Sequence, residues 1–170
     1  MNHSQIVHHT LQDNGIFPNN RMLPLLVYRN ALALPEHDPA VLFERVFDEN
    51  HWPGAWRNGI FGFHHYHSTA HEVLGVYDGE AEVQFGGDDG ITATVSRGDV
   101  VIIPAGVAHK NLRSSQKFGV VGAYPQGQRP DTCYGKPRER RRTDQNITAL
   151  ALPLADPVYG AEGPMQRYWL

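Results

Sequence analysis

The sequence predicts an all-β domain whose short antiparallel strands form a sandwich or a closed barrel. Between residues 56 and 124, brief apolar stretches alternate with turns rich in Gly, Pro and Asp, and such regular spacing is typical of these folds. The 17 glycines and 12 prolines of this 170-residue chain favour many turns over long helices. The expected strands are residues 59–67, 72–77, 81–85, 91–95, 100–103, 108–112 and 118–123.

The chain length fits a single domain that covers residues 1–170. The strand-rich core is expected at about 56–124, with an N-terminal strand and helix in 25–51. Residues 125–170 are rich in Pro, Gly and Arg, and they lack the apolar content of a second domain. We therefore expect a C-terminal arm that wraps the barrel or a partner subunit.

The N-terminal region shows one strand pattern and one helix pattern. Residues 25–34 alternate loosely between apolar and polar side chains and predict an edge strand. Asp38 suits the N-cap position and Pro39 the first helical position, which together predict a helix start. That helix should end by Asn50, because the Trp-Pro-Gly sequence at 52–54 breaks it.

Charge and cysteine content restrict the class of protein and its compartment. Fifteen basic and eighteen acidic side chains give a formal charge of −3, which offers no strong attraction to nucleic acid or to a membrane surface. The basic run at 136–142 has no interleaved aromatic residues, so we expect a solvated loop or an intersubunit salt-bridge arm. Cys133 is the only cysteine, which excludes an internal disulfide. Residues 1–16 lack the pattern of a signal peptide, and the cytoplasm is the expected compartment.

The densest chemical signal is a cluster of histidines, because four of the ten lie within eight residues. His65 and His67 are two residues apart and would share one face of a strand. Glu72 follows after a short stretch that can turn its carboxylate back to the same pocket. His109 comes about forty residues later, after a Pro-Ala-Gly turn. Three imidazoles and a carboxylate suit iron(II), manganese(II), nickel, copper or zinc rather than a metal that prefers thiolates.

These residues resemble the two sequence motifs of the cupins. The first motif, G-x5-H-x-H-x4-E-x6-G, is matched by Gly59, His65, His67, Glu72 and Gly79. The second motif, G-x5-P-x-G-x2-H-x3-N, is matched by Gly98, Pro104, Gly106 and His109. Its last position holds Arg113 instead of Asn, and Asn111 is a candidate for that structural role.

The resemblance covers residues 59–124 well, and the stretches HHYHSTAHEVLG and GDVVIIPAGVAHKN are similar to those of small bacterial single-domain cupins of unassigned function. It implies a double-stranded β-helix, the cupin jelly-roll barrel, here with one short N-terminal helix and a C-terminal arm. It also implies one divalent transition metal bound by His65, His67, Glu72 and His109.

Two alternatives stay open at these positions. The same four residues could form a buried polar network without a metal. Alternation along the strand points His64 and His71 away from the pocket, but a one-residue bulge would exchange His71 for Glu72. The three tryptophans are expected to pack in the core or at an interface rather than line a ligand pocket; they are Trp52, Trp56 and Trp169.

The fold and the metal ligands do not determine a reaction. We expect a metal-dependent enzyme of oxygenase or isomerase/lyase type that acts on a small molecule, with a non-catalytic binding or sensing module as the alternative. Seed-storage cupins usually have two barrels and are secreted, so that class is disfavoured. Barrel edges and the trailing arm predict a homodimer. No catalytic residue is assigned, but candidates for a base are Tyr66, Lys110, Arg57 and Tyr124.

Overall fold

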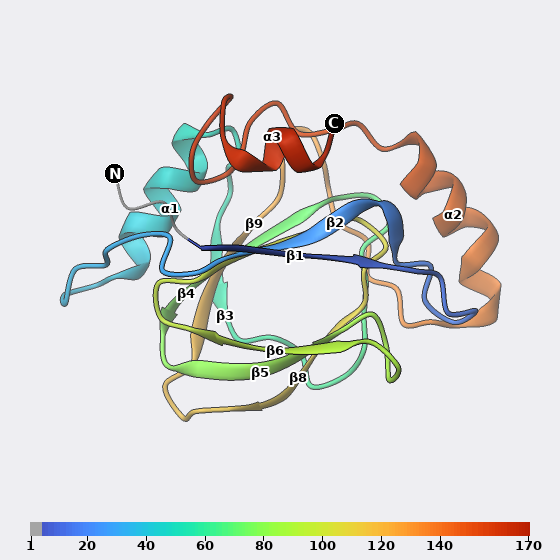
Figure 1. The fold of residues 1–170 in the computed structure, drawn as a ribbon, viewed down its shortest axis with the longest axis horizontal. Helices are drawn as coiled ribbons and strands as arrows, with labels where there is room; N and C mark the ends of the chain where they lie inside the picture. Colours follow the sequence, from blue (N-terminus) through green and yellow to red (C-terminus); the bar gives the residue numbers. More distant parts are fainter. Residues whose placement is uncertain (1–4) are drawn as a thin grey trace.

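The computed structural model describes residues 5–170 and has two antiparallel sheets with helices outside them (Figure 1). The six-stranded sheet has the order β1-β2-β7-β4-β9-β3, and the three-stranded sheet has the order β6-β5-β8. The predicted all-β jelly roll is confirmed. The strands are β1 (Ile6–Leu11), β2 (Asn20–Tyr28), β3 (Trp56–Asn58), β4 (Glu72–Asp78), β5 (Glu80–Phe85), β6 (Ile91–Ser96), β7 (Val100–Ile103), β8 (His109–Ser114) and β9 (Gly119–Ala123).

The helices are short and lie at the periphery of the two sheets. Helix α1 is followed in the C-terminal region by a 3-10 turn, η1, and by helices α2 and α3; their bounds are α1 (Ala40–Glu49), η1 (Pro137–Glu139), α2 (Arg140–Ala149) and α3 (Pro164–Tyr168). In Figure 1, α1 and α3 lie on the side of the large sheet away from β5, β6 and β8, and α2 lies at one end. Among residues 5–170, no helix is long and apolar enough to cross a membrane.

Both faces of the large sheet are buried, which explains the uninterrupted apolar sequence of β7. One face packs against α1 and the C-terminal segment through residues that include Phe43, Ile102, Val121 and Trp169. The other face packs against the small sheet through residues that include Leu74, Val83, Ile103 and Val120. The residues packed between the large and the small sheet form the interior of the barrel. The candidate site lies beside this interior.

The N-terminal strand differs from the prediction in place and in role. Strand β2 begins at Asn20 and ends at Tyr28, and residues 29–34 leave the sheet through a turn in which Asn30 has a φ of 49°. Strand β2 is also not an edge strand, because the polar segment β1 pairs with it on the side away from β7. The edge position was wrong because the weak alternation of β1 did not reveal a strand there. The bounds were wrong because β2 is apolar over only part of its length.

Helix α1 starts one residue later than the sequence suggested. Pro39 is the N-cap residue, and Asp38 precedes it with a φ of 44°. The Asp38 carboxylate does not cap the helix but lies 3.0 Å from the guanidinium of Arg57. The helix ends at Glu49, as predicted, and the backbone N–H of Trp52 then donates to the carbonyl of Phe47 at 2.8 Å.

The expected strand at 59–67 is a loop that touches β8 at only a few backbone positions. The N–H of Asn111 donates to the carbonyl of Phe61 at 2.9 Å, and His65 and His109 exchange two hydrogen bonds of 3.2 and 2.9 Å. Tyr66 makes a second isolated bridge with Cys133 on its other side. The segment that carries the histidine pair is therefore held by β8 and by the C-terminal arm, not by a continuous ladder.

The C-terminal arm contains helices that the sequence did not predict. The basic run at 136–142 is neither a loop nor fully solvated, because it forms η1 and the first turn of α2. Arg140 pairs with Asp13 near the N-terminus and with Asp144 one turn along the helix. Only Thr143 of α2 is buried, so the helix has no apolar periodicity that a sequence pattern could reveal.

Candidate metal centre

The structure brings the four predicted ligands together. One potential ligand nitrogen from each of His65, His67 and His109 lies within 4.8 Å of the other two. The Oε2 atom of Glu72 lies 3.2 Å from Nε2 of His67 and 3.1 Å from Nε2 of His109. All four side chains are buried. A single ion could therefore contact three imidazoles and one carboxylate, although the four assigned ligands remain a prediction.

The second ring nitrogen of each histidine faces a backbone carbonyl, which can only accept a hydrogen bond. The three contacts are His65 Nδ1 with the carbonyl of Phe63 at 3.0 Å, His67 Nδ1 with that of Asp131 at 2.5 Å, and His109 Nδ1 with that of Val107 at 3.0 Å. In the neutral form of each imidazole, Nδ1 therefore carries the proton and Nε2 presents a lone pair. Metal-bound histidines are held in this way in proteins.

The carboxylate of Glu72 has a buried oxygen that no described group satisfies. Its Oε2 atom accepts no hydrogen bond of acceptable geometry, although two imidazole nitrogens lie close to it. In the Nδ1–H tautomer those nitrogens have no proton to donate. A buried carboxylate oxygen that faces lone pairs is unfavourable unless a cation lies between them. The residues present thus fit a divalent metal better than they fit a neutral polar network.

Burial and mutual contact determine the protonation of the cluster. Burial, followed by the neighbouring His109, lowers the pKa of His65 to about 3, so this imidazole is neutral at pH 7. Burial would raise the pKa of Glu72, but the adjacent His67 and His109 outweigh it and hold that pKa below its usual range. Burial would lower the pKa of His67, but the charge of Glu72 raises it overall. Glu72 therefore stays ionised at neutral pH, and it favours the protonated form of the adjacent His67 when no metal is bound.

A tight turn delivers His109 to the cluster. Gly106 has a φ of 95°, and a Cβ atom there would lie 2.3 Å from the carbonyl oxygen of Asn19. Only glycine suits that position. The N–H of Gly106 donates to the carbonyl of His67 at 2.8 Å, so the turn before His109 is hydrogen-bonded to the segment that carries the histidine pair.

The carboxylate of Asp131 holds the other side of the same segment, a role that the sequence did not reveal. It accepts hydrogen bonds from the backbone N–H of Ser68 at 2.6 Å and of Thr69 at 3.2 Å, and another from the Ser68 hydroxyl. Its own backbone carbonyl is the acceptor for His67 Nδ1. Asp131 therefore positions His67 through the loop. Nothing in the sequence around residue 131 marks this role.

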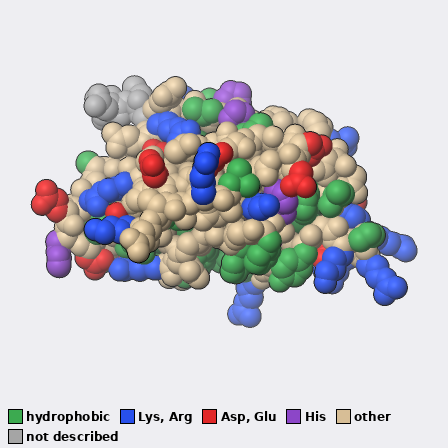
Figure 2. Space-filling model, turned by 90° about the horizontal axis from the view of Figure 1, so that it is seen from below, with side chains coloured by type: hydrophobic (Ala, Val, Ile, Leu, Met, Phe, Trp, Pro, Cys, Tyr) green, Lys and Arg blue, Asp and Glu red, His purple; other side chains and the backbone are tan. Residues whose placement is uncertain are grey.

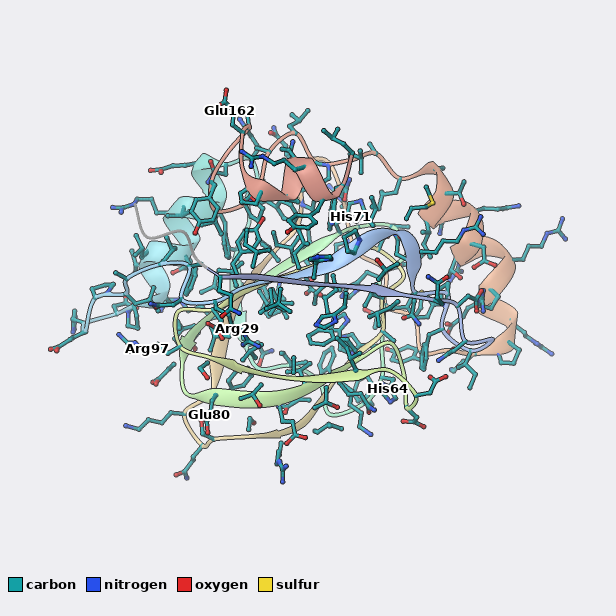
Figure 3. The ribbon with its side chains drawn as sticks, in the orientation of Figure 1. Arg29, His64, His71, Glu80, Arg97 and Glu162 are labelled. Atoms are coloured by element: carbon teal, nitrogen blue, oxygen red, sulfur yellow. The ribbon has the colours of Figure 1, made fainter. Side chains whose placement is uncertain are left out.

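The two additional histidines lie outside the cluster (Figure 3). His64 points toward the turn between β5 and β6, where its Nε2 lies 2.7 Å from Asp88 Oδ1. His71 lies on the side of α3, where its Nδ1 accepts a hydrogen bond from the N–H of Ala105 at 2.9 Å and its ring packs against Trp169. In the structure it is Glu72, not His71, that faces the other ligands.

A cavity of about 380 Å³ opens beside the cluster. Its walls are mainly apolar and aromatic, and they are formed by Trp56, Asn58, Gly59, Ile60, Phe61, His65, His67, Glu72, Leu74, His109, Tyr124, Pro130 and Thr132. The expectation that the tryptophans only pack was wrong for Trp56, while Trp52 and Trp169 are buried in the core. The cavity volume falls within the range of about 300–1,000 Å³ that is usual for small-molecule sites.

Of the four candidate bases, only Tyr124 lines the cavity. Burial and the nearby Glu72 raise its pKa above the usual range, so its hydroxyl stays protonated at neutral pH. Arg57 pairs with Glu44 and Asp38 outside the cavity. The hydroxyl of Tyr66 donates to Thr143 on the arm at 3.1 Å.

The remaining candidate base, Lys110, and the motif candidate Asn111 also lie outside the cavity walls. Lys110 is absent from the lining of this cavity. Asn111 is absent as well, and its side-chain amide donates to the hydroxyl of Ser114 at 3.1 Å. Tyr124 is thus the one candidate that the structure leaves in position to touch a bound molecule in this cavity.

Comparison with known proteins identifies the family. A family model described as a cupin domain matches residues 52–117. The uncharacterized protein YjlB of Bacillus subtilis (strain 168) is 43% identical over 158 residues, which cover 93% of this chain and 93% of that protein. The chain belongs to the cupins. The assignment by motif is confirmed, and the loop and turn that carry the predicted ligands lie within the matched region of this cupin.

Solved structures with a related fold are more distant. Procruciferin, an 11S globulin from Brassica napus, is 20% identical with a TM-score of 0.39; the match covers 68% of this cupin but only 24% of the globulin. The epimerase RmlC from Legionella pneumophila is 14% identical with a TM-score of 0.40, over 72% of each chain. Acireductone dioxygenase from Bacillus anthracis is 12% identical with a TM-score of 0.40, over 76% of this cupin and 84% of that chain.

Proposed function

We propose that this cupin is a metal-dependent enzyme of oxygenase or isomerase/lyase type that acts on a small molecule. One observation carries the proposal: three Nε2 lone pairs and the unsatisfied oxygen of Glu72 meet at the wall of a cavity that can admit a ligand. The donor set suits iron, manganese, nickel, copper or zinc. Such an ion, when bound, supplies a Lewis acid and open coordination positions for a ligand oxygen.

The chain itself supplies orientation and one proton. His65, His67 and His109 are fixed by their Nδ1 hydrogen bonds to backbone carbonyls, so their Nε2 atoms need no rearrangement on binding. Tyr124 keeps its proton at neutral pH and lies beside Glu72, so it would donate a hydrogen bond to a bound oxygen rather than remove a proton. The apolar residues of the walls would limit the contact of a bound ligand with water.

One observation favours the alternative, a module that binds a small molecule without turnover. Apart from the four predicted ligands, Tyr124 is the only titratable side chain among the described residues that line the cavity. An enzyme that removes a proton needs a group that is ionised near pH 7. A binding module needs only the shaped cavity.

The first experiment is elemental analysis of protein purified without an affinity tag and without added metal. About one equivalent of iron, manganese, nickel, copper or zinc supports the proposal. Iron would direct the search to oxygen chemistry, and zinc or manganese to isomerase or lyase reactions. Less than a tenth of an equivalent, even after incubation with each metal and removal of the excess, would contradict it.

We also propose that this cupin is a homodimer. The edge strands β1, β3, β6 and β8 leave backbone groups without a neighbouring strand in the described chain, and a two-fold dimer is the commonest way to cover such edges. Light scattering at micromolar concentration should give twice the chain mass of 19.0 kDa. A value equal to the chain mass would contradict this.

A further inference from the structure

The cavity walls restrict the charge of a ligand. Among the described residues that line the cavity, none is Lys or Arg. Arg57 follows Trp56 on β3, but it is absent from the cavity lining and forms ion pairs with Glu44 and Asp38. A phosphate ester carries close to two negative charges at neutral pH and is normally bound by cationic side chains or by helix N-termini. No such group lies on these walls, so a phosphate ester would meet no cationic side chain there.

Aromatic rings from two separate parts of the chain contribute to the cavity walls. Trp56 on β3 and Tyr124 after β9 have ring centroids 6.5 Å apart, and Tyr124 meets His67 edge-on at 5.9 Å. Phe61 comes from the loop between β3 and β4, and its ring meets His65 edge-on at 5.1 Å. An aromatic ligand could therefore contact rings next to two of the predicted metal ligands.

The ring of Phe61 is supported in a position that leaves it accessible. It stacks on Phe63 with an interplanar angle of 13° and a centroid distance of 4.9 Å, and the two side chains are 51% and 45% exposed. Tyr134 lies beyond Phe63 at 5.9 Å. Figure 2 shows that hydrophobic side chains gather on the underside of the molecule. Half-exposed stacked aromatic rings at the wall of a cavity mark a binding surface for apolar or aromatic groups.

We infer that this cupin takes a flat aromatic or conjugated molecule that carries no phosphate group. Its ring would lie against the aromatic side chains that Phe61 and Trp56 contribute to the cavity walls, next to the predicted metal ligands. This ligand class deepens and rests on the proposed function, but the preference for a ring rests only on the described walls of the cavity.

The test uses pairs of probes that differ only in the ring. Benzohydroxamate and acetohydroxamate share one chelating group with one negative charge, and they are titrated into the zinc-loaded protein. Benzamide and acetamide are the neutral pair for the metal-free protein. The fluorescence of Trp56 reports binding, because it is the tryptophan on the cavity wall whereas Trp52 and Trp169 lie in the core. Trp56→Phe is the control, because any fluorescence change that remains in this variant comes from Trp52 or Trp169.

The phenyl member of each pair should bind at least about tenfold more tightly, since burying a ring and placing it against aromatic neighbours both favour it. Phe61→Leu keeps an apolar side chain but removes the ring, and should reduce this preference about threefold or more. Phe118→Leu makes the same change in a residue packed against the barrel core, outside the cavity lining, and should leave the preference unchanged. Glycerol 3-phosphate should bind weakly to the zinc-loaded protein.

The outcomes separate this inference from the proposed function. Equal binding of the ring and methyl probes in both forms overturns the inference, and so does glycerol 3-phosphate that binds as tightly as benzohydroxamate. If the protein retains no zinc but the metal-free form still prefers benzamide in a manner that depends on Phe61, the metal proposal fails and the aromatic ligand class stands.

Discussion

Replacement of Asp131 by Asn tests whether the C-terminal arm controls the metal centre. In the native chain the Asp131 carboxylate accepts two hydrogen bonds from Ser68 and one from the N–H of Thr69, while the backbone carbonyl of Asp131 accepts the Nδ1–H of His67. The amide of Asn can replace only one of the carboxylate oxygens as an acceptor and places an NH₂ group against the Ser68 hydroxyl. The loop should loosen, and His67 should lose its fixed orientation.

Loss of a group that orients a metal ligand typically lowers metal affinity about 10- to 100-fold, which corresponds to about 1.4–2.8 kcal/mol. That range agrees with the value of about 1.5–3 kcal/mol for one hydrogen bond to a charged group. Competition with a chromophoric chelator for Zn²⁺ measures the affinity directly. The matched control is Asp88→Asn, since Asp88 pairs with His64 outside the cluster, and it should change the affinity less than about twofold. Equal losses in the two variants would refute the reasoning.

Three further results are expected. His67→Ala should remove most of the bound metal, whereas His64→Ala should leave it nearly unchanged; equal loss by elemental analysis would overturn the ligand assignment. Burial lowers the pKa of His71 to about 4 from 6.5, so the unfolded chain binds the extra proton between these values and stability falls as the pH drops from about 6.5 to 4. His71→Asn keeps an acceptor for the backbone N–H of Ala105 but cannot take up the proton. In urea unfolding of the metal-free protein, this variant should lose up to about 3 kcal/mol less of its free energy of unfolding between pH 6.5 and 4 than the native chain does. The same pH dependence in both proteins would contradict this. Tyr28→Phe removes a buried 2.5 Å hydrogen bond to Asp156. This should lower the free energy of unfolding by about 1.5–3 kcal/mol and lower Tm by several degrees. A Tm within one degree of the native value would show that this hydrogen bond contributes no such stability.

Motif spacing predicted which four side chains lie together because the turns around them depend on single residues. Gly79 and Gly106 both have positive φ values, and a Cβ atom at either position would overlap neighbouring atoms. Such positions are visible in a sequence as fixed glycines next to short apolar strands. The limits of β7 were predicted for a related reason, because both of its faces are buried and every one of its residues is apolar.

Features that depend on contacts distant in sequence left no such signal. The role of Asp131 arises from hydrogen bonds to residues more than sixty positions earlier. Thr143 is the one buried residue of helix α2, so no apolar periodicity marks the helix. The loop that contains Phe61 has the alternation of a strand, but it meets β8 at only a few backbone positions. The sequence does not show that its half-exposed aromatic rings lie at the wall of a cavity.

Alternation along residues 65–68 links the metal centre to the C-terminal arm. His65 and His67 face the metal site, while Tyr66 and Ser68 face the arm, where the Tyr66 hydroxyl donates to Thr143 and the Ser68 hydroxyl accepts from the amide of Asn146 at 3.0 Å. This segment has no continuous strand ladder to hold it. The arm therefore does more than cover the barrel: it supplies the contacts on one side that keep the histidine pair in place on the other.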